Sequence, residues 1–194
     1  MAAPHDDRRV SFLRAALRCF ARYGYRRTSM ETIARAADVS RPALYQYYRG
    51  KEEIFRAAVG RGLDDLASRA ETEARAPGEP TDRLLAVLGL VLGMYDLRGE
   101  PADHFRAELI DETYARAGDL WQEFEQRLIS ALSSVLRAAE DLDGRGAGTN
   151  EAEMAALLLY GTKGIALHVD DQRERQKLLR GFVALTARGL SLTN

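Results

Sequence analysis

Hydrophobic residues recur at helical spacing along most of the chain. Between residues 10 and 23 apolar side chains fall three or four positions apart, with arginines on the other faces. The same period continues over residues 51–76 and then over 81–95, 102–115, 119–142, 150–169 and 173–190. Breaks that contain Gly, Pro or Asp separate these segments. The pattern predicts an all-α protein of about nine helices.

Two short helices joined by a tight turn are predicted between residues 28 and 48. Thr28 stands three residues before Glu31, so its hydroxyl can cap a new helix while the glutamate reaches back in a capping box. Ser40 suits the N-cap of the second short helix. Pro42 then falls in the first turn, where its missing N–H costs little. The order predicts a helix-turn-helix.

The second short helix has a face suited to reading DNA. Leu44 and Tyr48 are four residues apart and are expected to face inward. Arg41 can offer two donors to a guanine edge, Gln46 can pair with a base, and tyrosine hydroxyls can reach phosphates. The alternative is a small helical hairpin with half-buried tyrosines. It explains the segment less well, because packing alone gives no reason for so many basic and aromatic residues on one exposed helix.

Many positions of this region resemble the DNA-binding domain of the TetR (tetracycline-repressor) family of bacterial regulators. They are Ala15, Ala16, Leu17, Phe20, Gly24, Tyr25, Thr28, Ser29, Ile33, Ala34, Ala37, Val39, Ser40, Leu44, Tyr45, Tyr47, Tyr48, Lys51 and Glu52. Two positions depart from the family pattern. Tyr48 stands where phenylalanine is commoner, and Gly50 stands where a capping Asn, Asp or Ser is usual.

The resemblance implies a set of DNA-binding residues. Thr28 and Ser29 match phosphate contacts at the start of the motif, and Lys51 matches a phosphate-binding lysine. The full expected set is Thr28, Ser29, Ser40, Arg41, Pro42, Ala43, Tyr45, Gln46, Tyr47 and Lys51. We therefore expect a helix-turn-helix domain over residues 1–50 and a helical ligand-binding and dimerisation domain over residues 51–194.

The distribution of charge fits this division. The chain has a formal net charge of -1. Residues 1–55 hold eleven Lys and Arg against six Asp and Glu, a balance of +5, so the remainder carries -6. A basic segment on an acidic body is expected when only that segment meets a polyanion, because clustered Lys and Arg make the phosphate contacts.

The middle helices carry a mixture of apolar walls and a few polar groups, which is what a small-molecule pocket needs. The expected ligand-binding residues are Leu88, Leu92, Tyr95, His104, Phe105, Glu108, Trp121 and Phe124. The alternative is a packed core in which His104 and Glu108 form an ordinary pair four residues apart. The resemblance favours a pocket for a small, largely apolar effector, although a body that contacts a protein partner instead stays open.

The last two predicted helices carry wide apolar stripes, and Gly161 and Gly164 would let another helix approach closely. Terminal helices of the resembling family form half of an intersubunit four-helix bundle. We therefore expect a homodimer that reads an inverted-repeat operator in double-stranded DNA.

Other classes of protein find little support. The histidines His5, His104 and His168 lack metal-ligand spacing, and no phosphate loop or nucleophile elbow is present. We thus expect no catalytic residue, no metal and no cofactor, with an all-helical enzyme as the weakest alternative. A single cysteine, no signal-peptide pattern in residues 1–9 and no long apolar stretch favour a cytoplasmic protein without a membrane role.

Together these features predict a TetR-like transcriptional regulator, in the form of a repressor that a small ligand releases from a palindromic operator. The alternative is a TetR-like DNA-binding protein that a protein partner regulates. The identity of the ligand, the operator sequence and the choice between repression and activation stay open at this stage.

Overall fold

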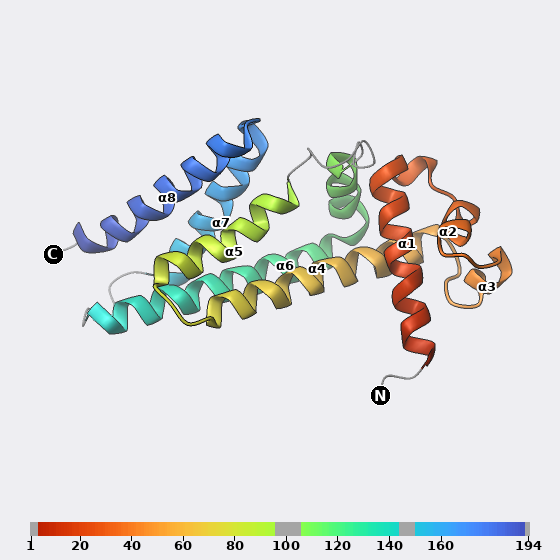
Figure 1. Ribbon diagram of the computed structural model, residues 1–194, viewed down its shortest axis with the longest axis horizontal. Helices are drawn as coiled ribbons and strands as arrows, with labels where there is room; N and C mark the ends of the chain where they lie inside the picture. The colour runs from red at the N-terminus through yellow and green to blue at the C-terminus, as the bar shows by residue number, and fades with distance from the viewer. Residues whose placement is uncertain (1–3, 96–105, 144–149, 193–194) are drawn as a thin grey trace. The chain divides into compact units, whose positions relative to one another are not determined.

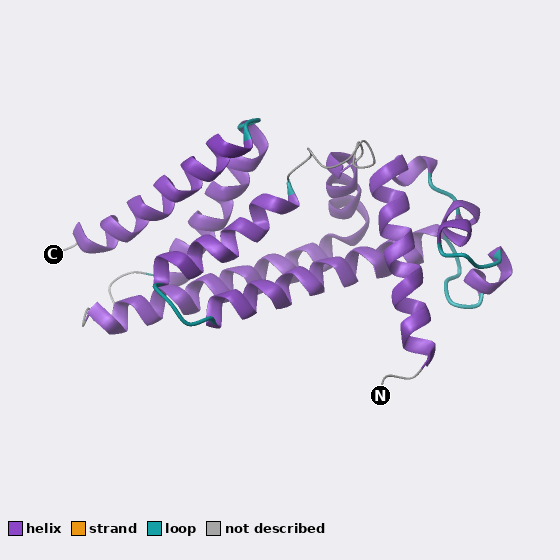
Figure 2. Ribbon diagram, viewed as in Figure 1, coloured by secondary structure: helices purple, strands orange, loops and turns teal. Residues whose placement is uncertain are grey.

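The computed structural model describes residues 4–95, 106–143 and 150–192. Within them it contains eight helices and no strand (Figures 1 and 2). The helices are α1 Pro4–Arg27, α2 Met30–Ala36, α3 Arg41–Tyr45, α4 Lys51–Arg75, α5 Pro80–Met94, α6 Arg106–Asp143, α7 Glu151–His168 and α8 Gln172–Leu192. The predicted all-α class is confirmed. Two predicted helices, 102–115 and 119–142, correspond to the single element α6, which bends at Ala117 (φ -143°, ψ 37°).

The chain divides into two compact units. The first comprises residues 1–64 and 97–122, and the second comprises residues 65–96 and 123–194. Helices α4 and α6 each contribute residues to both units. The predicted division at residue 50 concerns the DNA-binding and sensing roles and stays a prediction.

The first unit contains the helix-turn-helix, built around a small aromatic core. Phe20 and Phe55 are fully buried and meet edge to face with ring centroids 5.0 Å apart. Tyr25 packs against Phe55 at 4.9 Å. Ile33 of α2 and Leu44 of α3 are also fully buried. This core holds α1, α2 and the start of α4 together, so that α3 is presented on a fixed support.

Helix α1 bends at Gly24, which adopts φ 76°. A Cβ atom at this position would lie 2.7 Å from the Glu108 carboxylate. The positive φ favours glycine at this position, and the missing side chain leaves room for the Glu108 carboxylate. The sequence places the end of the first helix at Gly24, and the structure shows a further turn after the bend that runs to Arg27.

That extra turn explains why the predicted capping box was wrong by one residue. Ser29, and not Thr28, is the N-cap of α2, and its hydroxyl accepts the N–H of Thr32 at 3.1 Å. The Thr28 hydroxyl instead donates to the Gly24 carbonyl at 2.7 Å and lies 3.1 Å from the Cys19 carbonyl. Thr28 therefore fastens the bend of α1, while Ser29 starts the helix-turn-helix.

The turn between α2 and α3 follows the sequence prediction. Ser40 is the N-cap of α3, with its hydroxyl accepting the Ala43 N–H at 3.3 Å, and Pro42 lies in the first turn. Asp38 adopts φ 55° in the turn, a conformation that Asp and Asn tolerate better than most residues. Leu44 and Tyr48 are both buried, as their spacing predicts.

In the second unit α5, α7 and α8 pack against one another. Gly161 of α7 lies against Phe182 of α8, since a Cβ atom at this glycine would meet the ring at 2.5 Å. Gly161 thus allows close packing within the chain, whereas a Cβ atom at Gly164 would meet nothing within 4 Å. No helix within the described ranges is long and apolar enough to cross a membrane.

Candidate nucleic-acid interface

Helix α3 presents most of its predicted DNA-reading side chains outward. The exposed residues are Ser40, Arg41, Pro42, Tyr45 and Gln46, and Ala43 and Tyr47 are partly exposed. The buried residues of the same segment lie on the opposite face and anchor it in the core. The members of the predicted set in and next to α3 are thus all accessible to a ligand, at least in part.

Arg41 and Tyr45 form a pair on that surface. The Arg41 Nη2 donates to the Tyr45 hydroxyl at 3.5 Å, and the guanidinium carbon lies 5.4 Å from the ring centroid. This hydrogen bond raises the pKa of Arg41 above its ordinary value. Both side chains remain exposed, so a permanently charged guanidinium is oriented by its neighbour and stays accessible to a base edge or a phosphate.

Tyr47 and Tyr48 have different environments although they are adjacent. The Tyr47 ring packs edge to face on Phe12 of α1, with centroids 5.1 Å apart. This contact holds Tyr47 at the edge of the reading surface. Tyr48 is 2% exposed, and its buried hydroxyl has no hydrogen-bond partner among the described residues. Tyr48, which stands where phenylalanine is commoner in the family, therefore places an unsatisfied polar atom in the core of the helix-turn-helix domain.

The two predicted phosphate contacts at the start of α2 separate in the structure. Ser29 is exposed, and its hydroxyl lies 2.9 Å from that of Thr32. Thr28 is 2% exposed, and its hydroxyl is occupied by the bend of α1. The exposed polar group at this position therefore belongs to Ser29.

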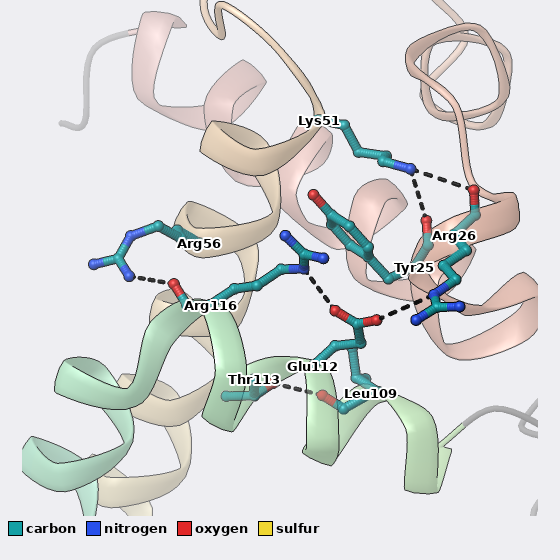
Figure 3. Close-up of polar contacts among 8 residues, drawn as sticks. All are labelled: Tyr25, Arg26, Lys51, Arg56, Leu109, Glu112, Thr113 and Arg116. Carbon is teal, nitrogen blue, oxygen red and sulfur yellow. Dashed lines mark hydrogen bonds and ion pairs between the residues drawn. The ribbon is translucent and has the colours of Figure 1, made fainter.

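Lys51 joins the C-terminal end of α1 to the N-terminal end of α4 (Figure 3). Its ammonium group donates to the carbonyls of Tyr25 at 3.0 Å and Arg26 at 3.3 Å. It also lies 4.4 Å from the Tyr25 ring centroid. An ammonium group has three N–H donors, so these two bonds leave one donor for a phosphate.

A polar network in the first unit connects the C-terminal end of α1 to α6 (Figure 3). The Arg116 guanidinium lies 4.1 Å from the Tyr25 ring centroid and donates through Nε to the Glu112 carboxylate at 2.6 Å. Glu112 is 9% exposed, and Arg26 of α1 lies 3.9 Å from its other oxygen. The first segment of α6 is thus tied by charge and by ring contact to the end of α1.

The bend of α6 at Ala117 adds a second connection to α4. The backbone at Ala117 is not helical, and the Arg116 carbonyl accepts a hydrogen bond from Arg56 at 2.5 Å. Arg56 also binds both oxygens of Asp119, at 3.0 and 2.7 Å. The hydrogen bond from Arg56 lowers the pKa of Asp119. Sequence reasoning missed this network, because only the four-residue spacing of Glu112 and Arg116 is visible in the sequence.

The sequence-predicted ligand residues are divided between the two units. Leu88, Leu92, Tyr95 and Phe124 are buried in the second unit, while Trp121 is buried in the first beside Tyr114. Glu108 also belongs to the first unit, where its carboxylate lies against Gly24. His104 and Phe105 lie outside the described residues. Leu92 lines a cavity of about 250 Å³ between α5 and α8.

The helix-turn-helix matches a known family model. Residues 12–58 match the model described as "Bacterial regulatory proteins, tetR family". The "HTH-type transcriptional activator FasR" of Mycolicibacterium smegmatis is 29% identical over 88% of this chain and 73% of its own length. The "HTH-type transcriptional repressor KstR" of the same organism is 31% identical over 43% of this chain and 41% of its own length.

Solved structures have the same fold over nearly the whole chain. A putative transcriptional regulator from Pseudomonas aeruginosa PAO1 is 18% identical with a TM-score of 0.76, covering 98% of this chain and 93% of that one. A putative TetR-family transcriptional regulator from Mesorhizobium loti is 16% identical with a TM-score of 0.75, covering 95% and 97%. These likenesses establish the fold. The family model identifies residues 12–58 as a helix-turn-helix domain of the TetR family, and the relatives named above are transcriptional regulators.

Proposed function

We propose that this regulator is a homodimeric repressor that reads an inverted-repeat operator through α3 and leaves it when a small molecule binds the body. The observation that carries the DNA-reading part is the outward surface of α3, where Arg41, Tyr45 and Gln46 are exposed beside the partly exposed Tyr47. Arg41 is the proposed base contact, since a guanidinium can bind a guanine edge through two donors.

Ser29 and Lys51 are the proposed phosphate contacts on either side of α3. Each is exposed or partly exposed and carries a donor. Thr28 supports them from inside by fixing the bend of α1. Ser40, Pro42 and Ala43 form the start of α3, and we propose that they bring its backbone close to the major groove of the DNA. Phosphate contacts position the domain, and the side chains of α3 supply sequence preference.

The proposed dimer interface is an apolar surface on α7 and α8. Four large apolar side chains there are strongly exposed: Leu157 (62%), Tyr160 (52%), Leu167 (63%) and Leu185 (68%). Those of α7 recur at helical spacing and include the open Gly164 between them. Strongly exposed apolar side chains on two neighbouring helices are typical of a protein contact, and a two-fold dimer would read two half-sites.

The proposed link between sensing and DNA release runs through the polar network of the first unit. Arg116 and Glu112 on α6 hold the end of α1, and Arg56 on α4 holds the bend of α6. A ligand that prefers a different position of α6 would shift the equilibrium away from the DNA-binding conformation. Coupling of about 1–3 kcal/mol would lower operator affinity roughly 5- to 150-fold.

Selection of binding sites from random DNA tests the reading function. The purified full chain should enrich an inverted repeat, and light scattering should give the mass of two subunits. Enrichment of an asymmetric single site by a monomer would contradict the proposed dimeric reading. A promoter fused to a reporter then gives the sign of regulation, since one relative is named an activator and another a repressor.

Tryptophan fluorescence tests the sensing function. Trp121 is the only tryptophan of the chain and is buried in the first unit, so it reports on the bent segment of α6. An effector should change Trp121 fluorescence and operator affinity over the same concentration range, and DNA should weaken effector binding to the same extent. If compounds that change the fluorescence leave DNA affinity unaltered, the body is a protein-contact or dimerisation scaffold instead.

A further inference from the structure

A groove in the second unit is lined by residues that have no role in the proposed function. It lies between α5 and α8 and has a volume of about 250 Å³. Its walls are Leu85, Gly89, Leu92, Gly93, Gln172, Arg175, Gln176, Leu179 and Arg180. A Cβ atom at Gly89 or Gly93 would meet nothing within 4 Å. The two glycines therefore leave the α5 side of the groove open.

Arg175 is the polar centre of the groove and is 6% exposed. Its Nε donates to the Val169 carbonyl at 2.5 Å, and its Nη1 donates to the Tyr95 carbonyl at 3.4 Å. These carbonyls belong to the C-caps of α7 and α5, where a cation is favoured by the helix dipoles. A guanidinium has five N–H donors, so these two bonds leave further donors at the wall of the groove.

The remaining walls divide into an apolar floor and a polar mouth. Leu92 and Leu179 are buried, and Leu85 lies beside them at intermediate exposure. Arg180 is exposed and adds a second cation. The lining residues include no Asp or Glu. The groove therefore combines positive charge with a leucine surface.

We propose that this groove binds a small amphipathic anion, with its carboxylate or phosphate on Arg175 and Arg180 and its alkyl chain on the leucines. The guanidinium fork matches either anion through two parallel hydrogen bonds. Pockets for drug-sized ligands span about 300–1,000 Å³, so the groove suits a single unbranched chain. The inference rests on the proposed function only in identifying this ligand as the effector.

The groove and the proposed dimer surface occupy different faces of α8. At about 3.6 residues per turn, Leu185 of the dimer surface is rotated by roughly 150° from the line of groove residues on α8. Dimerisation through the exposed leucines therefore leaves the groove open to a ligand. This separation lets binding be measured on the intact dimer.

Calorimetry on the full chain with decanoate, decyl phosphate and decanol tests the site. Decanoate or decyl phosphate should bind with one site per chain, and decanol should bind at least tenfold more weakly, because it lacks the negative charge that strengthens hydrogen bonds from a guanidinium group. Tighter binding of decanoate identifies a carboxylate ligand, and tighter binding of decyl phosphate identifies a phosphate. Equal binding of decanol, or no binding of either anion, would overturn the proposal.

Binding to substituted proteins tests whether the ligand occupies the groove. Gly93→Leu should abolish binding by filling the groove, and Arg180→Gln should weaken it roughly two- to fivefold, as expected for an exposed ion pair. Arg173→Gln is the matched control, since Arg173 is an exposed arginine of the same helix outside the groove. Arg175→Lys keeps the charge but loses the fork, and its folding is checked by circular dichroism. Unchanged binding by Gly93→Leu would overturn the assignment.

The site and the regulatory role can fail separately. If the anion binds through the groove but operator affinity does not change, the site stands and the proposed sensing function fails. If operator affinity responds to another compound while Gly93→Leu has no effect on that response, the sensing function stands without this groove.

Discussion

Tyr48→Phe should stabilise the protein, because it removes a polar atom that the structure leaves without a partner. Tyr48 is 2% exposed, and its hydroxyl oxygen makes no hydrogen bond among the described residues. A buried unsatisfied hydroxyl costs about 1–3 kcal/mol. The ring itself is retained, so the packing loss is small. We expect a gain of about 1–2 kcal/mol in the free energy of unfolding, or a rise of roughly 2–8 °C in melting temperature for a chain of this size.

Tyr45→Phe is the matched control, since it removes the same atom from an exposed ring three residues earlier. Tyr45 is 41% exposed, so its substitution should change the free energy of unfolding by less than about 0.5 kcal/mol. Thermal and urea unfolding of the three proteins at one subunit concentration give the comparison, and the concentration must be fixed because the proposed dimerisation would shift the apparent stability. A loss of stability in Tyr48→Phe would refute the reasoning and show that this hydroxyl has a partner in solution.

Four further predictions concern helix packing, the proposed dimer surface and the ion pairs of the first unit. Gly161→Ala should destabilise the chain by about 1–3 kcal/mol because the new methyl overlaps the Phe182 ring, whereas Gly89→Ala, where a Cβ atom meets nothing, should be neutral or stabilising in urea unfolding. Leu157→Glu combined with Leu185→Glu should convert the proposed dimer to a monomer in light scattering, and an unchanged dimer mass would place the interface elsewhere. Among the described residues, Arg116→Met should leave the largely buried Glu112 carboxylate with the longer ion pair to Arg26 at 3.9 Å, and should cost about 2 kcal/mol. Adding Glu112→Gln should recover part of that loss. If the stability effects of the two substitutions simply add, the Arg116–Glu112 ion pair does not contribute to folding. Because Arg56 lowers the pKa of Asp119 from its ordinary 3.8, Asp119 stabilises the fold above that pH and loses this effect as the pH falls through the folded value, so the stability difference between wild type and Asp119→Asn should shrink between pH 7 and pH 3.

Local signals were sufficient to predict the helix-turn-helix. The Ser40 cap, the position of Pro42 and the inward spacing of Leu44 and Tyr48 depend on neighbouring residues, and the structure has all of them. The prediction failed at Thr28. Helix α1 continues for one more turn after Gly24, and the Thr28 hydroxyl donates to the Gly24 carbonyl instead of capping α2. No residue pattern in the sequence indicates this hydrogen bond.

The body was less accessible to sequence reasoning, since its features depend on contacts between distant residues. A pattern of apolar and aromatic residues cannot distinguish a packed core from a pocket wall, so Leu88 and Leu92 were predicted alike although only Leu92 lines the groove. Arg175 was missed because its partners are carbonyls, and any residue type supplies a carbonyl. The sequence predicts that Gly161 lets another helix approach closely, and in the structure that helix is α8 of the same chain, through Phe182.

The comparison of Arg41→Ala with Lys51→Ala on a selected operator and on random DNA tests most directly whether α3 reads sequence. Fluorescence anisotropy over a series of salt concentrations gives both affinities. Arg41→Ala should lose about 1–3 kcal/mol on the operator and much less on random DNA, while Lys51→Ala should weaken both alike and reduce the salt dependence by about one ion. Equal losses on both DNAs for Arg41→Ala, or no loss at all, would contradict the account.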